Sequence, residues 1–354
     1  MSTSDDGQPR LADPAEARSN CGVGVVMDLD GDGGHWVLAD GLELLENLEH
    51  RGTTGAEEAT GDGAGVMIQT PHEFFREEVD ADLTPGEYAV GTLFLPTDDG
   101  ARERLRETVE AQFESEGLDV LAWRTVPTDN ADIGQTALDS EPVVEQVFVE
   151  SADGLTGDDF GRRLYVARRV LESHVEEVEP PGHERFYVVS LDPDTVVYKG
   201  LLKGEQVADY YPDLRDERVG TTFAMVHARF STNTLGAWHL AHPYRRIIHN
   251  GEFNTIQGNI NWMRARETDI ESDAFADVDK LKPVIDDPEQ SDTASVDNAL
   301  ELLLADGRDL PHALRMLIPE AWRGEQNDVG GDRRDWYDYH ASLVEPWDGP
   351  ALVA

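Results

Sequence analysis

Short apolar runs alternate along the chain with segments of helical periodicity. The strand-like runs occupy residues 21–29, 63–70, 88–95, 143–150, 185–191, 222–230 and 245–250. Apolar residues recur every three or four positions, as on a helix that packs one face against a sheet, in residues 38–48, 101–114, 160–171 and 296–304. Several strand-like runs are apolar on both faces, which is typical of sheets buried between other layers. The pattern therefore predicts a mixed α/β (α+β) domain built as a layered sandwich.

Three acidic, proline-containing stretches are predicted to form surface loops: 127–141, 175–184 and 267–292. The last is the longest and most polar, and we expect it to be mobile without ligand. At the C-terminus, EPWDGPALVA begins like a strand after a turn at 348–350 and stops as its apolar run starts. Such a short terminal strand favours a C-terminally incomplete domain, and a natural end at a sheet edge is the alternative.

Length and composition agree with one domain that carries insertions. The chain has 354 residues, of which 39% are apolar, and no apolar run approaches the ~18 residues that a membrane span needs. Residues 1–20 are polar and lack the apolar core of a secretory signal. We therefore expect a soluble, cytoplasmic protein that has no membrane partner.

The overall charge is strongly acidic. The 72 Asp and Glu residues outnumber the 29 Lys and Arg residues, and the net charge of -43 argues against nucleic acid as a partner. The acidic residues are scattered along the whole chain, which resembles proteins from salt-loving organisms. Such a surface repels itself less at molar salt, where the Debye length is about 3 Å. An acidic docking face is the alternative interpretation.

Cys21 is the only cysteine in the sequence, so neither an intrachain disulfide nor a cysteine-ligated iron–sulfur cluster can form within the chain. A lone cysteine is by default a small buried apolar side chain. Cys21 nevertheless begins an apolar run with small neighbours, which allow a ligand close to the backbone. If the preceding peptide bond is cut, Cys21 also carries an α-amine. Its ordinary pKa of about 7.7–8.0 suits a general base near neutrality.

Two arginines lie in loops rich in small and hydroxylic residues. Arg51 belongs to HRGTTGAE, which fits an anion site and a surface turn equally well. Arg229 belongs to HARFSTN, at the end of an apolar strand. Its guanidinium can bind a carboxylate through two parallel hydrogen bonds or form a structural ion pair. Both residues are therefore candidates for binding an anion.

Two further motifs carry candidate groups for other parts of a ligand. In HNGEFN, the side-chain amide of Asn250 and the backbone N–H of Gly251 can stabilise an oxyanion, although an Asn-Gly pair more often forms a turn. In SDTAS, Asp292 can bind an ammonium group. The same segment precedes a periodic run, so one of its side chains is also expected to cap a helix.

Two other patterns carry less weight. The glycines of GDGAG (61–65) resemble a phosphate loop, but a strand-like run follows them instead of a helix N-terminus. Four histidines suggest zinc, yet their spacings of 12, 3 and 7 fit no common ligand set: His227, His239, His242 and His249. We therefore predict neither a nucleotide site nor a metal site.

Taken together and in this order, the motifs resemble the class II glutamine amidotransferases, which have an N-terminal nucleophile. They are most similar to the amidotransferase domain of the glutamate synthase large subunit. The resemblance runs from Cys21 to the C-terminus and rests on CGVGVV, LENLEHRGTTGAE, GDGAGVM, VYKGLL, YPDL, HARFSTNT, WHLAHPYRRIIHNGEFNTIQGN, ASVDNALELLL and HALRMLIPEAW. It implies a four-layer αββα Ntn-hydrolase sandwich over residues 21–354 and a removed propeptide at 1–20. A full domain of this family continues beyond EPWDGPALVA, so the resemblance also implies that one sheet lacks its last strands in this chain.

The resemblance also implies the catalytic groups. Cys21 would be the nucleophile, with its own α-amine as base and proton shuttle. Asn250 and Gly251 would stabilise the tetrahedral oxyanion. The resemblance implies a second set of residues that bind the substrate.

Among these, Arg229 would clamp the α-carboxylate of glutamine, and Asp292 its α-ammonium group. Arg51 looks like the family arginine that supports the nucleophile loop. His227 and Thr232 would lie behind the residues that touch the substrate.

The implied reaction is hydrolysis of L-glutamine to glutamate and ammonia through a Cys21 thioester. Ammonia would pass to a synthase domain or subunit that aminates 2-oxoglutarate. No cofactor is expected in this chain, whereas FMN and an iron–sulfur cluster are implied for the synthase part. The alternatives are the glutaminase part of another class II amidotransferase, such as glucosamine-phosphate synthase or amidophosphoribosyltransferase, and a non-catalytic scaffold that keeps its propeptide.

Overall fold

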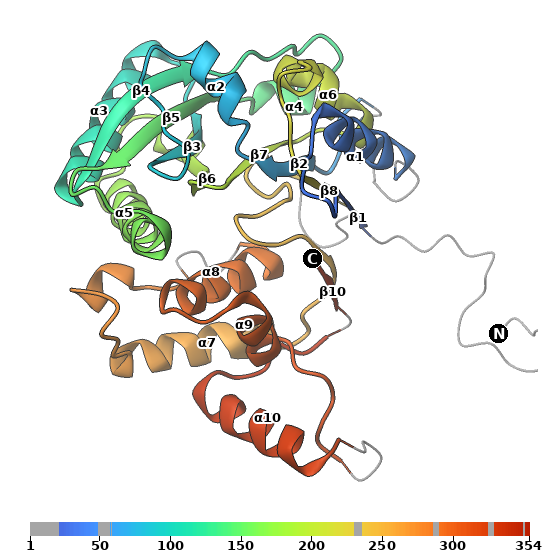
Figure 1. Ribbon diagram of the computed structural model, residues 1–354, viewed down its shortest axis with the longest axis vertical. Helices are drawn as coiled ribbons and strands as arrows, with labels where there is room; N and C mark the ends of the chain where they lie inside the picture. Colours follow the sequence, from blue (N-terminus) through green and yellow to red (C-terminus); the bar gives the residue numbers. More distant parts are fainter. Residues whose placement is uncertain are drawn as a thin grey trace, which may run out of the picture.

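The computed structural model describes residues 21–48, 57, 59–229, 236–285, 290–324, 329–349 and 351–354. Two antiparallel sheets with their covering helices form one part of the molecule, and the C-terminal helices form a second part beside it (Figure 1). No helix within the described residues has both the length and the apolar character needed to cross a membrane. The predicted mixed α/β class is confirmed, and the strand pairs in both sheets are antiparallel.

The first sheet contains four strands in the order β1-β8-β2-β7. Their bounds are β1 Gly22–Met27, β8 Phe223–Ala228, β2 Ala64–Gln69 and β7 Thr195–Gly200. Helix α1 (His35–Asn47) packs on β1 and β8. A Cβ on Gly41 would lie 2.6 Å from the Cβ of Ala224, so this glycine permits the close approach of α1 to β8.

The second sheet has the order β4-β5-β3-β6. Its strands are β4 Leu118–Thr125, β5 Val143–Ser151, β3 Tyr88–Leu95 and β6 Tyr187–Asp192. Helices α3 (Asp99–Ser115) and α5 (Gly157–Val178) pack on this sheet and bury apolar side chains against it, among them Leu105, Val109, Phe113, Phe160 and Leu164. The periodic apolar positions in 101–114 and 160–171 are therefore the buried faces of these helices.

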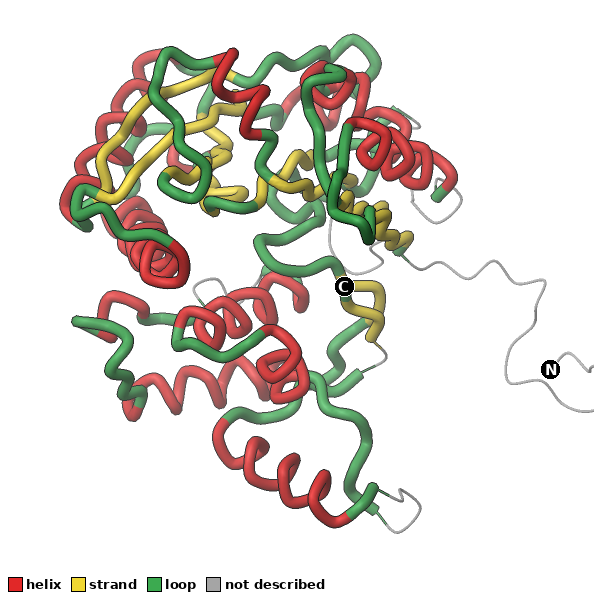
Figure 2. The backbone as a smooth tube through the Cα atoms, in the orientation of Figure 1, coloured by secondary structure: helices red, strands yellow, loops and turns green. Residues whose placement is uncertain are grey.

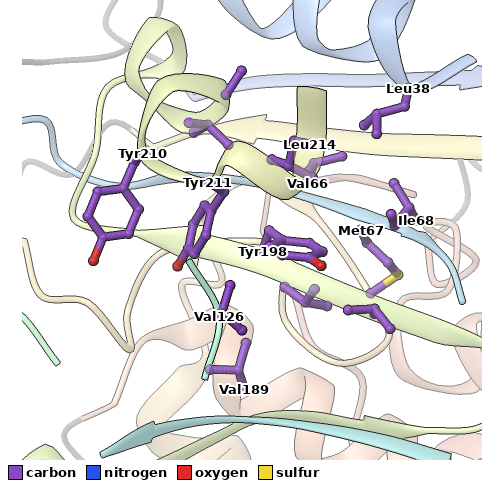
Figure 3. Close-up of a cluster of buried hydrophobic side chains, with 14 of the residues drawn as sticks. Leu38, Val66, Met67, Ile68, Val126, Val189, Tyr198, Tyr210, Tyr211 and Leu214 are labelled. Atoms are coloured by element: carbon purple, nitrogen blue, oxygen red, sulfur yellow. The ribbon is translucent and has the colours of Figure 1, made fainter. Parts of the chain in front are cut away.

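A continuous apolar core joins the two sheets. It includes Val66 and Ile68 from β2 together with Val90 from β3 and Phe148 from β5. Figure 3 shows one region of this core, where Tyr198, Tyr210 and Tyr211 lie near Val126 and Val189. Three shorter helices complete this part of the molecule: α2 His72–Glu78, α4 Gln135–Asp139 and α6 Val207–Tyr210.

The C-terminal part is mainly helical, as Figure 2 shows. It contains α7 Ile256–Arg266, α8 Asp292–Ala305, α9 Leu310–Leu317 and α10 Gly331–Leu343. These helices share a second core with members such as Ile260, Val296, Leu300, Met316 and Tyr165. Because Tyr165 belongs to α5, the second core joins the helical part to the helix that covers the second sheet.

Two short strands link the parts near the end of the chain. Strand β9 (His249–Gly251) pairs antiparallel with β10 (Ala351–Val353), as expected for the short apolar run at the C-terminus. The predicted strand at 245–250 is wrong for its first four residues, where the backbone makes bends and side-chain contacts instead.

The loop predictions need two corrections. Residues 127–141 contain the short helix α4, and α5 continues to Val178 inside the predicted loop 175–184. In 267–292, the described residues form only two 3-10 turns before α8, at Glu267–Asp269 and Val278–Leu281. Strands β4 and β7 were not predicted. Strand β4 mixes charged and apolar residues, and the apolar run of β7 ends at Lys199.

Candidate active site

Cys21 lies immediately before β1 and is partly buried. Gly22 is paired with Ala228 of β8, so Cys21 and Arg229 are the next residues beyond the paired ends of these strands. Antiparallel pairing therefore brings together a cysteine and an arginine that are about 200 residues apart in the sequence. A partly exposed cysteine in this position contradicts the default interpretation as a small core residue.

Arg229 is held by the segment that precedes β2. Its backbone N–H donates to the Gly63 carbonyl at 2.8 Å, and its Nη1 donates to the Asp62 carbonyl at 3.3 Å. Only 5% of Arg229 is exposed. A Cβ on Gly63, which has φ 129°, would lie 3.0 Å from Ala241. The absence of a side chain at Gly63 therefore allows the loop that carries Ala241 to pack closely against it. The first part of the GDGAG motif thus supports Arg229, and β2, not a helix, begins within the motif at Ala64.

Asn250 connects β9 directly to the cysteine. Its Nδ2 donates a hydrogen bond of 2.7 Å to the Cys21 carbonyl oxygen. Ile248 and Ala354 each donate a backbone hydrogen bond to the other. In an antiparallel ladder such pairs alternate with pairs that exchange no backbone hydrogen bond, so Gly251 and Ala351, three positions along, form a pair without one. By this alternation the N–H of Gly251 points away from β10. One N–H of the Asn250 amide contacts Cys21, and the amide has a second N–H to offer.

Asp292 lies in the first turn of α8. Ser291 is the N-cap, because its side chain accepts from the Ala294 N–H, which confirms the predicted helix cap. The carboxylate of Asp292 accepts from the backbone N–H of Phe253 at 2.9 Å and from that of Thr293 at 2.7 Å. Asp292 therefore touches the chain three residues beyond Asn250, and the helix dipole favours its negative charge.

The buried histidines around these residues are structural neighbours of the site. His227 Nε2 lies 3.0 Å from the His249 carbonyl, and the His227 ring stacks on His242 with centroids 4.0 Å apart. Burial lowers the pKa of His227 to about 3, so this ring is neutral at physiological pH. No group of three or more metal-binding side chains occurs within the described residues.

The structure brings five predicted residues into one region. Cys21 and Asn250 are in direct contact, Arg229 neighbours Cys21 through strand pairing, and Asp292 is joined to the β9 segment through Phe253. Gly251 follows Asn250 in β9. The predicted residues Arg51 and Thr232 lie outside the described residues.

Sequence reasoning did not identify the residues that support this region. The main ones are Asp62, Tyr244, Thr293 and Asp297. All four lie inside or beside quoted motifs, but each acts through a contact between segments distant in sequence. The one signal that could have found two of them is the spacing of four residues between Thr293 and Asp297, which places both on the same face of the predicted helix.

Comparisons with known proteins show the family to which the chain belongs. The family described as glutamine amidotransferases class-II matches residues 21–354. The chain is 42% identical over 340 residues to the glutamate synthase [NADPH] large chain of Bacillus subtilis (strain 168), covering 94% of this chain and 22% of that protein. It is 39% identical over 349 residues to the chloroplastic ferredoxin-dependent glutamate synthase 2 of Arabidopsis thaliana, covering 97% and 21%.

A similar match is found in yeast. The glutamate synthase [NADH] of Saccharomyces cerevisiae (strain ATCC 204508 / S288c) is 40% identical over 360 residues, covering 97% of this chain and 16% of that protein. The chain thus spans about a fifth of the length of the relatives it matches. Because the family match covers nearly the whole chain, the chain belongs to the class-II glutamine amidotransferases and is a glutaminase domain similar to that part of glutamate synthases.

Proposed function

We propose that this domain hydrolyses L-glutamine to glutamate and ammonia with Cys21 as the nucleophile. The observation that carries the proposal is the hydrogen bond between Asn250 Nδ2 and the Cys21 carbonyl. It links the residue that would attack the amide to the residue that would stabilise the resulting negative charge. The proposal includes removal of residues 1–20, which gives Cys21 a free α-amine.

In the first half-reaction, the α-amine takes the thiol proton and the sulfur attacks the side-chain amide carbon of glutamine. The carbonyl oxygen becomes an oxyanion, for which Asn250 and Gly251 supply neutral N–H donors. The α-ammonium then returns its proton to the amide nitrogen. The carbon–nitrogen bond breaks, and ammonia leaves a γ-glutamyl thioester on Cys21.

In the second half-reaction, water attacks the thioester carbon while the same α-amine takes a proton from it. The carbon–sulfur bond breaks and releases glutamate, and the thiol is regenerated. An amine whose ordinary pKa lies near neutrality can both accept a proton and return it. No separate histidine base is required, which agrees with a buried, neutral His227.

Substrate recognition would use the two charged ends of the amino acid. Arg229 would bind the α-carboxylate through paired N–H donors, and Asp292 would bind the α-ammonium group. Arg51 and Thr232 would support the loops around the nucleophile. The proximity of Arg229 to Cys21 by strand register and the contact of Asp292 with the β9 segment support this arrangement.

The ammonia would be delivered to a synthase domain or subunit that aminates 2-oxoglutarate. The relatives are named glutamate synthases, which supports a synthase partner. FMN and an iron–sulfur cluster would belong to that part. An iron–sulfur cluster does not fit this chain, because its only cysteine is the proposed nucleophile. The domain would act in the cytoplasm.

The arrangement of α1, the two sheets, and α3 with α5 supports a four-layer αββα sandwich of the Ntn-hydrolase type. The net charge of -43 supports adaptation to high salt. The four-layer sandwich and the adaptation to high salt are both part of this proposal.

Two measurements test the function. Intact-mass analysis of the purified chain should find Cys21 at the N-terminus, whereas retention of residues 1–20 would support a scaffold. Labelling with an electrophilic glutamine analogue, followed by peptide mapping, should locate the adduct on Cys21. Assays with the acceptor substrates of glucosamine-phosphate synthase and amidophosphoribosyltransferase would test whether the domain is the glutaminase part of one of those enzymes instead.

A further inference from the structure

The segment 244–253 carries Asn250 and Gly251, and only β9 within it is regular structure. Its position therefore depends on side-chain contacts, and the start of α8 provides a series of them. The contacts are Tyr244 Oη with Ser291 Oγ (2.6 Å), the N–H groups of Arg245 and Arg246 with Asp297, His249 Nδ1 with Thr293 Oγ1 (2.9 Å), and the Phe253 N–H with Asp292 (2.9 Å).

Asp297 fixes the beginning of this segment. Its Oδ2 accepts from the Arg245 N–H at 3.2 Å and its Oδ1 from the Arg246 N–H at 2.9 Å. The residue is fully buried, and burial together with the nearby Glu301 raises the pKa of Asp297 to about 6. A carboxylate in this environment is costly unless its hydrogen bonds are used. Two adjacent main-chain donors define the path of the backbone here.

Thr293 fixes the residue directly before Asn250. Its hydroxyl lies 2.9 Å from Nδ1 of His249, and both residues are 2% exposed. The His249 ring also stacks on Phe253, with centroids 4.5 Å apart and an interplanar angle of 17°. The His249 carbonyl contacts His227 Nε2 on its other side. Both the ring and the carbonyl of His249 are therefore held.

We infer that Thr293 and Asp297 are positioning residues, which set Asn250 against Cys21 by anchoring the segment 244–253 to α8. This inference rests on the proposed glutaminase function. It also means that one helix both carries Asp292 and places the oxyanion donors. Displacement of a reacting group by about 1 Å can reduce turnover up to about 100-fold, so distant anchors of this kind affect the rate.

The test compares Thr293→Val with Thr293→Ser in the full chain. Valine nearly preserves the size of threonine but removes the hydroxyl, whereas serine keeps the hydroxyl. We expect Thr293→Val to lower kcat for glutamine about 10-fold with KM changed less than about 2-fold, and Thr293→Ser to recover most of kcat. Thr92→Val is the matched control, because Thr92 is 1% exposed and lies in β3 of the other sheet.

Asp297→Asn provides an independent variant, because asparagine keeps one acceptor oxygen and loses the other. It should also lower kcat more than it raises KM, with activities normalised to the folded fraction from thermal melting. Wild-type kcat in Thr293→Val, or no recovery in Thr293→Ser, would overturn the inference while leaving the glutaminase function intact. A wild-type chain without Cys21-dependent hydrolysis would instead overturn the proposed function, and the inference with it.

Discussion

The side-chain amide of Asn250 donates a 2.7 Å hydrogen bond to the carbonyl oxygen of Cys21, a residue 229 positions away in the sequence. The bond fixes the distance between the proposed nucleophile and the proposed oxyanion donor before any substrate binds. Catalysis by charge stabilisation depends on donors that are already in place when the charge develops. The contact therefore connects the fold to the proposed chemistry, and the first predictions below concern the region around it.

Replacing the thiol should remove hydrolysis without unfolding the domain. Cys21→Ala and Cys21→Ser are expected to lose glutaminase activity, because alanine has no nucleophile and serine has a far less acidic one. The side chain is only partly buried, so the thermal midpoint should change little. Ammonia release and circular dichroism melting check the two statements. Normal turnover in either variant would reject Cys21 as the nucleophile.

Removing the side-chain amide of Asn250 should reduce turnover more than substrate binding. Asn250→Ala is expected to lower kcat about 100- to 1000-fold, the usual effect of losing one oxyanion donor. Steady-state kinetics with glutamine measure both constants. Asn261→Ala is the control, because Asn261 is exposed on α7. A rise in KM with unchanged kcat would assign Asn250 to ground-state binding instead.

The charged residues should affect substrate binding. Arg229→Lys loses the paired N–H geometry for a carboxylate, and Asp292→Asn loses the negative charge facing an ammonium group. Each is expected to raise KM for glutamine about 10-fold or more, since a hydrogen bond to a charged group contributes about 1.5–3 kcal/mol. Glutamine analogues that lack one charged end provide the check. The Arg229 variant should discriminate less between glutamine and an analogue without the carboxylate.

Stability should depend on pH through His227. Burial holds its pKa at about 3, whereas an unfolded histidine titrates near 6.5. Between these values the unfolded chain binds more protons, so the His227 contribution destabilises the folded state as pH falls from about 6.5 towards 3. In His227→Gln this contribution disappears, and the unfolding free energy should vary less with pH, by up to about 1.4 kcal/mol per pH unit. Urea denaturation between pH 4.5 and 7 measures the difference; identical slopes would contradict it.

Salt should stabilise the domain. The net charge of -43 makes the folded surface repel itself, and added ions screen that repulsion. The pair of Arg168 and Glu301, 2.6 Å apart with side chains at most 5% exposed, is shielded from the same ions. The thermal midpoint is therefore expected to rise by several degrees between low and molar KCl. A midpoint that falls with KCl would remove the argument for salt adaptation.

Much of the fold was visible in the local sequence pattern. The apolar repeats at 101–114 and 160–171 correspond to α3 and α5, and the strand-like run at 88–95 is β3. In these elements the side chains that must be buried recur with the period of the structure. The pattern failed at β4, where exposed and half-buried residues interrupt the apolar ones.

The site divides in the same way. The sequence by itself determined the candidate chemical groups at Cys21, Arg229, Asn250 and Asp292, because the motifs around them, taken together and in order, resemble one family. Only the tertiary structure decided which of these groups lie next to one another and what holds them there, as in the contact of Thr293 with His249. The physical reason is that strand pairing and buried hydrogen bonds join segments far apart in the chain, and residue spacing records neither their register nor their partners.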